Sequence, residues 1–209
     1  LQLGVDGGQA VTVAGGVRNE GTISASASKA DASAIWIGAD VSAPTLYNSG
    51  TIQTGVSGNT ANTSTAVLIG AGANLPSMTN VGVITAAFTG NHGDAVAVRD
   101  ASGTLTQFTN AGTIAVGITP DTTDDTPLDG EAIAIDLSAN TTGVTLRQYG
   151  IVASSDSTAT DSDDDGVPDN AEPAIIGDIR LGSGDDALNV ENGTIIGDIS
   201  FGGGADALN

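Results

Sequence analysis

A five-residue motif, Asn-x-Gly-Thr-Ile, returns about every 30 residues along this chain of 209 residues. Its four clearest copies begin at Asn19, Asn48, Asn80 and Asn110, the third with Val in place of Thr, and degenerate copies follow at Gln148–Val152 and Gly193–Ile195. A motif repeated at this spacing is typical of solenoids, in which each repeat forms one layer of a stack. The repeat therefore predicts a stacked architecture.

A second pattern lies between the motifs, a run of Ala and alternating aliphatic residues that predicts a short buried strand. Its copies are Ala10–Val13, Ala34–Ile37, Ala66–Ile69, Ala95–Val98, Ala132–Ile135 and Ala174–Ile176. The stretch from an Ala run to the next motif is nearly constant in length, whereas the stretch from a motif to the next Ala run varies. Constant stretches indicate strands and tight corners, and variable ones indicate loops tolerated along one edge.

Each motif is predicted to form a corner of its coil. Gly permits a positive φ at a bend, and Asn two places earlier bonds its own backbone and can stack on its counterparts as a ladder of amides. Thr-Ile then begins a strand, with Ile inside. The predicted corner residues are Asn19, Gly21, Asn48, Gly50, Asn80, Gly82, Asn110 and Gly112.

These patterns predict an all-β fold, a right-handed parallel β-helix with coils of about 20–40 residues. An antiparallel sandwich is the alternative, but it gives no reason for one motif to recur at this spacing. Near the C-terminus the repeat contracts to 20 residues, as Gly177–Asn189 and Gly197–Asn209 show. We expect decorated coils over residues 1–153, an inserted acidic loop over 154–173, and compact coils over 174–209 that stop in mid-repeat, as in a segment of a longer protein.

The charge balance restricts the partners. The chain has five basic and 25 acidic residues, which give a net charge of −20. Nucleic acids and anionic membranes are disfavoured because binding them requires basic residues, whereas divalent cations suit so acidic a surface. No apolar run approaches the roughly 18 residues of a membrane span, and the absence of Cys excludes disulfides.

The sharpest local signal is the acidic stretch from Asp161 to Glu172. Its spacing matches that of a calcium loop, with Gly166 at the sharp bend. The predicted ligands are Asp161, Asp163, Asp165, the carbonyl of Val167, Asp169 and Glu172. The ending Val167-Pro-Asp169 resembles the thrombospondin type 3 calcium repeat more than a helix-flanked EF-hand. A solvated acidic linker is the alternative interpretation.

Other acidic residues give weaker signals. Asp186 and Asp206 lie in runs that resemble half-copies of a calcium-binding nonapeptide, but they recur every 20 residues instead of every nine, so we expect corner residues. Asp121, Asp124, Asp125 and Asp129 lack ligand spacing, and we expect a solvated loop.

The Asn-x-Gly-Thr-Ile motifs and the Gly-Asp-Ile…Gly-x-Gly-x-Asp-x-Leu-Asn coils together resemble the passenger regions of Gram-negative autotransporters (type V secretion). The resemblance covers essentially the whole chain. It implies secretion, display on the bacterial cell surface, and a following C-terminal barrel in the outer membrane.

An enzymatic role is disfavoured, since the chain has no Gly-x-Ser-x-Gly motif and one His, His92, in a Gly-rich loop. We expect an extracellular stalk or adhesin that presents loops along one edge to a cell-surface or extracellular ligand. Self-association is a further candidate, because exposed coil ends invite strand pairing. The alternative function is a carbohydrate-active β-helix, in which Trp36 offers a stacking platform for a sugar.

Overall fold

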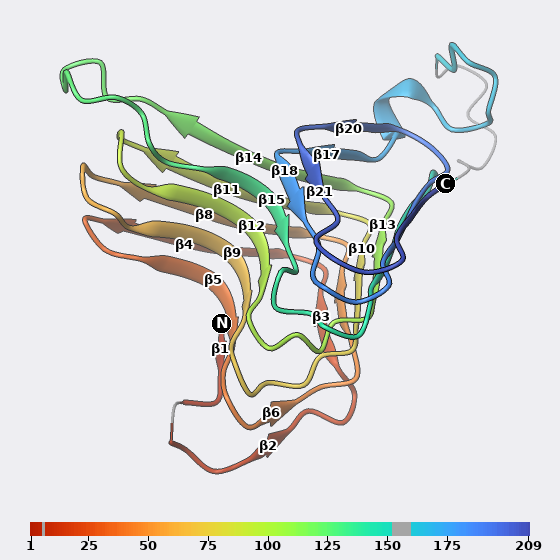
Figure 1. Ribbon diagram of the computed structural model, residues 1–209, viewed down its shortest axis with the longest axis horizontal. Helices are drawn as coiled ribbons and strands as arrows, with labels where there is room; N and C mark the ends of the chain where they lie inside the picture. The colour runs from red at the N-terminus through yellow and green to blue at the C-terminus, as the bar shows by residue number, and fades with distance from the viewer. Residues whose placement is uncertain (6, 152–159) are drawn as a thin grey trace.

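The computed structural model describes residues 1–5, 7–151 and 160–209, and these residues form three large parallel β-sheets and one separate two-stranded sheet (Figure 1). Sheet I consists of β1 (Gln2–Leu3), β5 (Ala32–Ile37), β9 (Thr63–Ile69), β12 (Asp94–Asp100), β15 (Ala132–Asp136), β18 (Asp178–Arg180) and β21 (Ile199–Ser200). Sheet II consists of β3 (Val17–Asn19), β7 (Leu46–Asn48), β10 (Ser77–Asn80), β13 (Gln107–Asn110), β16 (Thr145–Gln148), β19 (Ala187–Val190) and β22 (Ala207–Leu208). Sheet III consists of β4 (Thr22–Ser28), β8 (Thr51–Ser57), β11 (Val83–Thr89), β14 (Thr113–Thr119), β17 (Ala174–Ile176) and β20 (Thr194–Ile196).

Each coil takes one strand from each sheet, in the order III, I, II. In the first four coils the chain then turns at an Asn-x-Gly corner into sheet III of the next coil, whereas the acidic loop joins β16 to β17. Every strand pairs in parallel with its counterpart one coil away, as in the pairing of β11 with both β8 and β14. The prediction of a parallel β-helix is confirmed.

The sequence motifs align in register along the stack. Ile52, Ile84 and Ile114 are direct partners on β8, β11 and β14, and all three are fully buried. On sheet II the corresponding inward column contains Leu46, Met78, Phe108, Leu146 and Leu188. Small and aliphatic columns of this kind fill the narrow interior between three sheets, which explains why a core with few aromatic residues suffices.

Two of the six Ala runs do not lie where the sequence pattern placed them. Val11–Thr12 forms β2, which pairs with β6 (Val41–Ser42) in a separate two-stranded sheet. Ala174–Ile176 forms β17, whose Ile175 pairs with Ile114 of the corner motif in sheet III. A short apolar run has the same pattern on any sheet, so only pairing with the neighbouring coil distinguishes these positions.

The corner glycines serve a purpose other than the predicted one. Gly21, Gly50, Gly82 and Gly112 are absent from the positive-φ residues. A Cβ at Gly50, Gly82 or Gly112 would instead lie 2.0, 2.2 or 2.1 Å from the carbonyl oxygen of the preceding coil's corner glycine. The expectation of a positive φ is therefore wrong at these corners, where Gly is required because the backbones of successive coils approach closely.

The compact C-terminal coils belong to the same stack as the decorated coils. β17 pairs with β14, β18 with β15, and β19 with β16. The expected boundary between residues 153 and 154 lies outside the described residues. No helix among the residues described has the length and apolar character that crossing a membrane requires.

Candidate functional site

The predicted amide ladder runs the length of the decorated coils. Asn19 Nδ2 donates to Asn48 Oδ1 at 2.7 Å, Asn48 to Asn80 at 2.8 Å, and Asn80 to Asn110 at 2.9 Å. Gln148 replaces Asn in the next coil and accepts from Asn110 at 3.2 Å. Each amide also bonds backbone groups around its corner, as Asn80 does with Gly82 and Thr113. The ladder satisfies buried polar groups where the chain turns.

The loops do not all project from one edge, as the sequence analysis expected. The loop at residues 120–131 joins β14 of sheet III to β15 of sheet I, and shorter loops at residues 58–62 and 90–93 join the same two sheets. The acidic calcium-type loop instead follows β16 of sheet II and precedes β17 of sheet III. The two long loops lie at opposite sides of the molecule (Figure 1). The expectation is wrong because Ala174–Ile176, which resembles the other Ala runs in sequence, lies in sheet III, whereas four of the other five runs lie in sheet I.

The structure brings three of the predicted calcium ligands together. Carboxylate oxygens of Asp161, Asp163 and Asp165 all lie within 4.8 Å of one another. Backbone N–H groups help to orient them, since Gly166 donates to Asp161 at 3.0 Å and Val167 donates to Asp165 at 2.7 Å. Gly166 has φ 88°, the left-handed conformation expected at its sharp bend.

The two other predicted carboxylate ligands lie outside this trio, and the carbonyl of Val167 stays a predicted ligand. Asp169 accepts from the backbone N–H and the hydroxyl of Ser162, at 2.8 and 2.5 Å, and is not part of the carboxylate trio. Glu172 also lies outside the trio. The side chain of Val167 is buried and would contact any Cβ added at Gly150, so this residue anchors the loop to the coil beneath it.

Electrostatic repulsion is concentrated in this loop. Burial raises the pKa of Asp163, and repulsion from Asp165 raises it further. Burial also raises the pKa of Glu172, together with the charges of Asp163 and Asp169. Glu172 therefore lies within the field of the trio, and a cation at the trio would relieve repulsion at both carboxylates.

Asn192, in the last described coils, holds the loop with its side chain. Asn192 Nδ2 donates to Asp165 Oδ2, while the backbone oxygen of Asn192 accepts from Gln148 at 3.1 Å. Asn192 Oδ1 is buried without a hydrogen-bond partner. Asn192 thereby connects Gln148, at the end of the amide ladder, with Asp165 of the acidic trio.

A second set of polar corners, between sheets I and II, was missed by the sequence analysis. Asp100 is buried and accepts from the backbone N–H groups of Ser102, Gly103 and Leu105. Asn140 occupies the same kind of corner in the next coil, accepting from Thr142 and Gly143. The available signal was an Asp/Asn-x-Ser/Thr-Gly pattern at 100–103 and 140–143.

Asp186 and Asp206 are corner residues, as expected. Asp186 is 2% exposed and accepts from the N–H of Val144 at 2.7 Å, and Asp206 accepts from the N–H of Asp186 at 3.0 Å. Burial raises the pKa of Asp186, and the charge of Asp206 adds to the rise. These carboxylates cap backbone donors of the preceding coil, 42 residues earlier in the chain for Asp186 and 20 residues earlier for Asp206.

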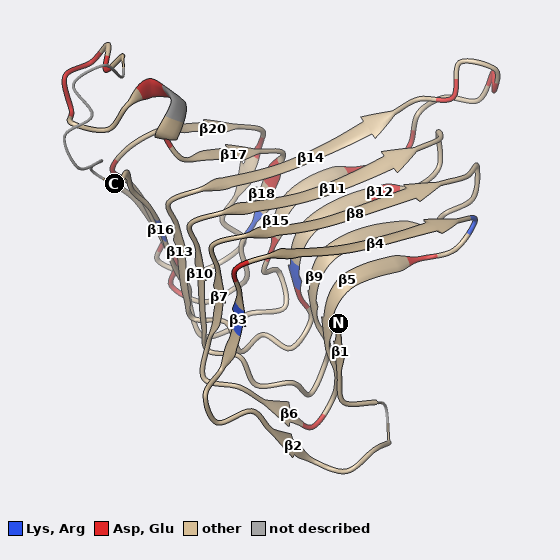
Figure 2. Ribbon diagram, turned by 180° about the vertical axis from the view of Figure 1, so that it is seen from behind, with Lys and Arg blue, Asp and Glu red and all other residues tan. Residues whose placement is uncertain are grey.

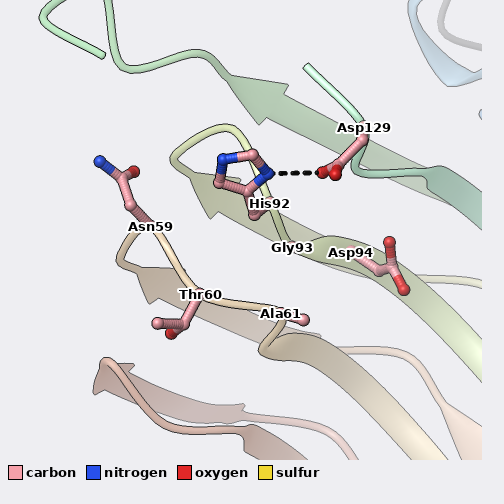
Figure 3. Close-up of a pocket in the computed structure, with 7 residues that line it drawn as sticks. All are labelled: Asn59, Thr60, Ala61, His92, Gly93, Asp94 and Asp129. Atoms are coloured by element: carbon pink, nitrogen blue, oxygen red, sulfur yellow. Dashed lines mark hydrogen bonds and ion pairs between the residues drawn. The ribbon is translucent and has the colours of Figure 1, made fainter. Parts of the chain in front are cut away.

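The edge between sheets III and I carries an open polar pocket of about 500 Å³ (Figure 3). It is lined by Asn59, Thr60, Ala61, His92, Gly93, Asp94 and Asp129. The long loop folds over this edge because Asn91, which is buried, donates to the carbonyls of Asp124 and Thr126 and accepts from the N–H of Asp121. The expected solvated acidic loop is exposed over much of its length but is held at these points.

His92 lies between a hydroxyl and a carboxylate in this pocket. Its Nδ1 is 3.0 Å from Asp129 Oδ1, and its Nε2 is 2.8 Å from Thr126 Oγ1. The Thr126 hydroxyl donates its single proton to Asp124 at 2.7 Å. In its bond with His92 the hydroxyl oxygen is therefore the acceptor, and Nε2 is the donor. The hydroxyl proton is directed away from the imidazole, an arrangement that fastens the loop and does not activate a nucleophile.

Trp36 lines a smaller pocket of about 380 Å³ with Asp31, Ser33 and Leu68. Asp31 Oδ1 accepts from the N–H of Thr63 at 2.9 Å, so this carboxylate caps the neighbouring coil. The pocket combines an aromatic surface with polar groups.

Comparison with known proteins identifies no relative: the chain matches no protein-family model, no curated protein and no solved structure.

Proposed function

We propose that this chain is part of a secreted β-helical stalk or adhesin on the bacterial cell surface, with a structural and interaction role. The observation that carries the proposal is the uninterrupted parallel stack, in which large loops project from the corners while the three sheets continue beneath them. Such a stack gains stability from nearest-neighbour pairing and tolerates loop variation without loss of the core. The motif resemblance to autotransporter passengers supports secretion and surface display.

The loop at residues 120–131 is the proposed contact element for an extracellular ligand. It is held by Asn91 and His92 while much of it is exposed, including Leu128 at 50%. A loop that is positioned by buried bonds and still exposes its side chains loses less entropy on binding than a free segment does.

The test is adhesion of beads coated with the chain to a panel of immobilised extracellular-matrix proteins and polysaccharides. In the matched variant, residues 120–131 are replaced by the sequence of residues 90–93, which joins the same two sheets in the preceding coil. We expect the wild-type beads to adhere to at least one surface and the variant to lose most of that adhesion. Absence of wild-type adhesion, or equal adhesion by the folded variant, contradicts the proposal.

Polysaccharide binding is the second candidate, favoured by the pocket at Trp36. An indole face beside hydroxyl and carboxylate groups suits the apolar face of a sugar ring. Adhesion confined to polysaccharide surfaces and lost in Trp36→Ala supports this candidate. Release of new reducing ends from the polysaccharide would extend it to cleavage.

We further propose that the loop at Asp161–Glu172 binds calcium as a structural ion. Asp161, Asp163 and Asp165 supply the converging oxygens. The nearby carboxylate of Glu172 adds negative charge that favours binding of the cation. Hard divalent cations favour such oxygen clusters. The ion would strengthen the attachment of the loop to the coil at Asn192.

Calorimetric titration with CaCl₂ tests this proposal, alongside thermal melts in calcium and in chelator. We expect one binding event and a higher melting temperature in calcium, with both lost in Asp163→Asn. Asp125→Asn, in the loop without ligand spacing, is the matched control and retains binding. Because the pKa values of Asp163 and Glu172 are raised, affinity should fall as the pH drops from 7 toward the ordinary carboxyl range. Absence of heat together with unchanged melts overturns the proposal.

A further inference from the structure

The strands of sheet III carry no charged residue on their outer face, although the chain has a net charge of −20, and Glu172 of the acidic loop borders this face only where β11 and β14 begin, at Val83 and Thr113. Burial alternates along these strands, as in β4, so that every second side chain points outward. The outward residues are Thr22, Ser24, Ser26 and Ser28 on β4, Thr51, Gln53, Gly55 and Ser57 on β8, Val83, Thr85, Ala87 and Thr89 on β11, Thr113, Ala115, Gly117 and Thr119 on β14, and Ala174, Ile176, Thr194 and Ile196 on β17 and β20. We call this surface the neutral face.

Figure 2 shows the neutral face from the front, with the strands of sheet III tan along their lengths. Acidic and basic residues appear instead in the loops at the strand ends and on other parts of the coil. Long-range repulsion between two copies of so acidic a chain opposes approach through the charged surfaces. The neutral face is where two copies meet with the least direct repulsion.

The neutral face has a hollow and a raised part. The hollow lies where Gly55, Ala87 and Gly117 are adjacent in register, and a shallow depression of about 450 Å³ is lined there by Gly55 and Ala87. A Cβ at Gly55 or Gly117 would have no neighbour within 4 Å. The hollow therefore has room for side chains from a second surface.

The raised part consists of exposed aliphatic side chains. Ile176 and Ile196 are register partners on β17 and β20, exposed by 38% and 60%, and Val83 is exposed by 37% at the start of β11. These apolar groups leave water favourably when they are covered. A two-fold axis that lies in the plane of the interface, parallel to the sheet, brings the raised part of one copy over the hollow of the other, and the same contact forms twice.

We propose that the neutral face is a self-association surface, on which a second copy of this chain docks face to face with two-fold symmetry. This inference rests on the proposed interaction role and names one partner for it. From strand rise and spacing, the face covers roughly 500 Å² per copy. The buried total of about 1,000 Å² is at the lower limit for a specific interface, so we expect a weak, reversible dimer.

Sedimentation equilibrium of the chain alone, over a concentration range from about 5 µM to about 500 µM, tests the proposal. We expect a monomer–dimer equilibrium for the wild type. Ala87→Glu and Ala87→Lys, each in the centre of the face on an exposed position, should weaken association at least tenfold, whereas an equimolar mixture of the two variants should recover part of it. The Lys variant is decisive, because it lowers the net negative charge and would strengthen any association limited by overall repulsion.

Thr141→Glu adds the same charge at an exposed site away from sheet III and is the matched control, expected to associate like the wild type. Circular dichroism and thermal melts verify that each variant is folded. A wild type that stays monomeric throughout, an Ala87→Lys variant that associates as well as the wild type, or a control that is weakened equally overturns the inference. No external ligand is present, so failure here is distinct from failure of the bead-adhesion test.

Discussion

Asn80 illustrates how one buried amide stabilises this fold. Its Nδ2 donates to Asn110, Gly82 and Thr113, and its Oδ1 accepts from Asn48 and from the N–H of Gly82. The residue is fully buried, so removing the amide leaves several polar groups without partners and without water. The requirement for Asn at this corner thus comes from bonds between coils as well as within its own turn.

We therefore predict that Asn80→Ala lowers the free energy of unfolding by about 2–4 kcal/mol. Asn19→Ala is the comparison, because Asn19 is the outermost described rung and accepts no amide from a preceding coil. The loss at Asn19 should be smaller. Urea denaturation followed by circular dichroism measures both, and equal losses would argue against an additive ladder.

Each strand of sheet III contributes one set of side chains to the core and another set to the outer surface. Its inward Ile, Val and Phe side chains fill the core, while most of its outward positions carry Thr, Ser, Gly and Ala. Glycine occurs in two settings on or beside these strands. Gly82 lies against the backbone of the preceding coil, with no space for a Cβ, whereas Gly117 faces open space.

The two glycines should respond oppositely to the same substitution. Gly82→Ala places a methyl group 2.2 Å from the oxygen of Gly50, and we expect a loss of more than about 2 kcal/mol from the displaced corner. Gly117→Ala should change stability by less than about 0.5 kcal/mol, or increase it slightly, because alanine restricts the unfolded chain. Thermal melts of the two variants decide the matter, and a tolerated Gly82→Ala would contradict the close-approach explanation.

The whole molecule combines a neutral, closely paired stack with strongly acidic loops. Arg18, Arg99, Arg147 and Arg180 each pair with a carboxylate, so little positive charge remains to offset the excess of acid. Self-repulsion of a net charge of −20 acts against the compact state. It also directs contacts with other acidic molecules toward the uncharged surface.

Screening this repulsion should stabilise the chain. We predict that the melting temperature rises when NaCl is increased from about 10 mM to about 300 mM, because the Debye length then falls from about 30 Å to below 10 Å. Differential scanning calorimetry in the presence of chelator measures the effect without calcium. A melting temperature that falls with salt would mean that the few arginine pairs outweigh the general repulsion.

The sequence alone determined the parallel β-helix, the amide ladder, and the corner role of Asp186, because each depends on residue types recurring at a coil-length spacing. It also predicted the convergence of Asp161, Asp163 and Asp165, whose alternate spacing acts within one local turn. Calcium itself remains a prediction. The positive φ expected at the corner glycines was wrong, since the constraint there comes from another coil and leaves no local sequence signal.

Only the tertiary structure decided which sheet receives Ala174–Ile176, and with it where the calcium-type loop projects. It likewise decided that Asn91 and His92 hold the loop at residues 120–131, and that the outward positions of sheet III form one continuous uncharged surface. The physical reason is common to all three. Each depends on the register between strands that lie one coil apart in space and up to about 60 residues apart in the chain, and a short segment cannot specify such a register by itself.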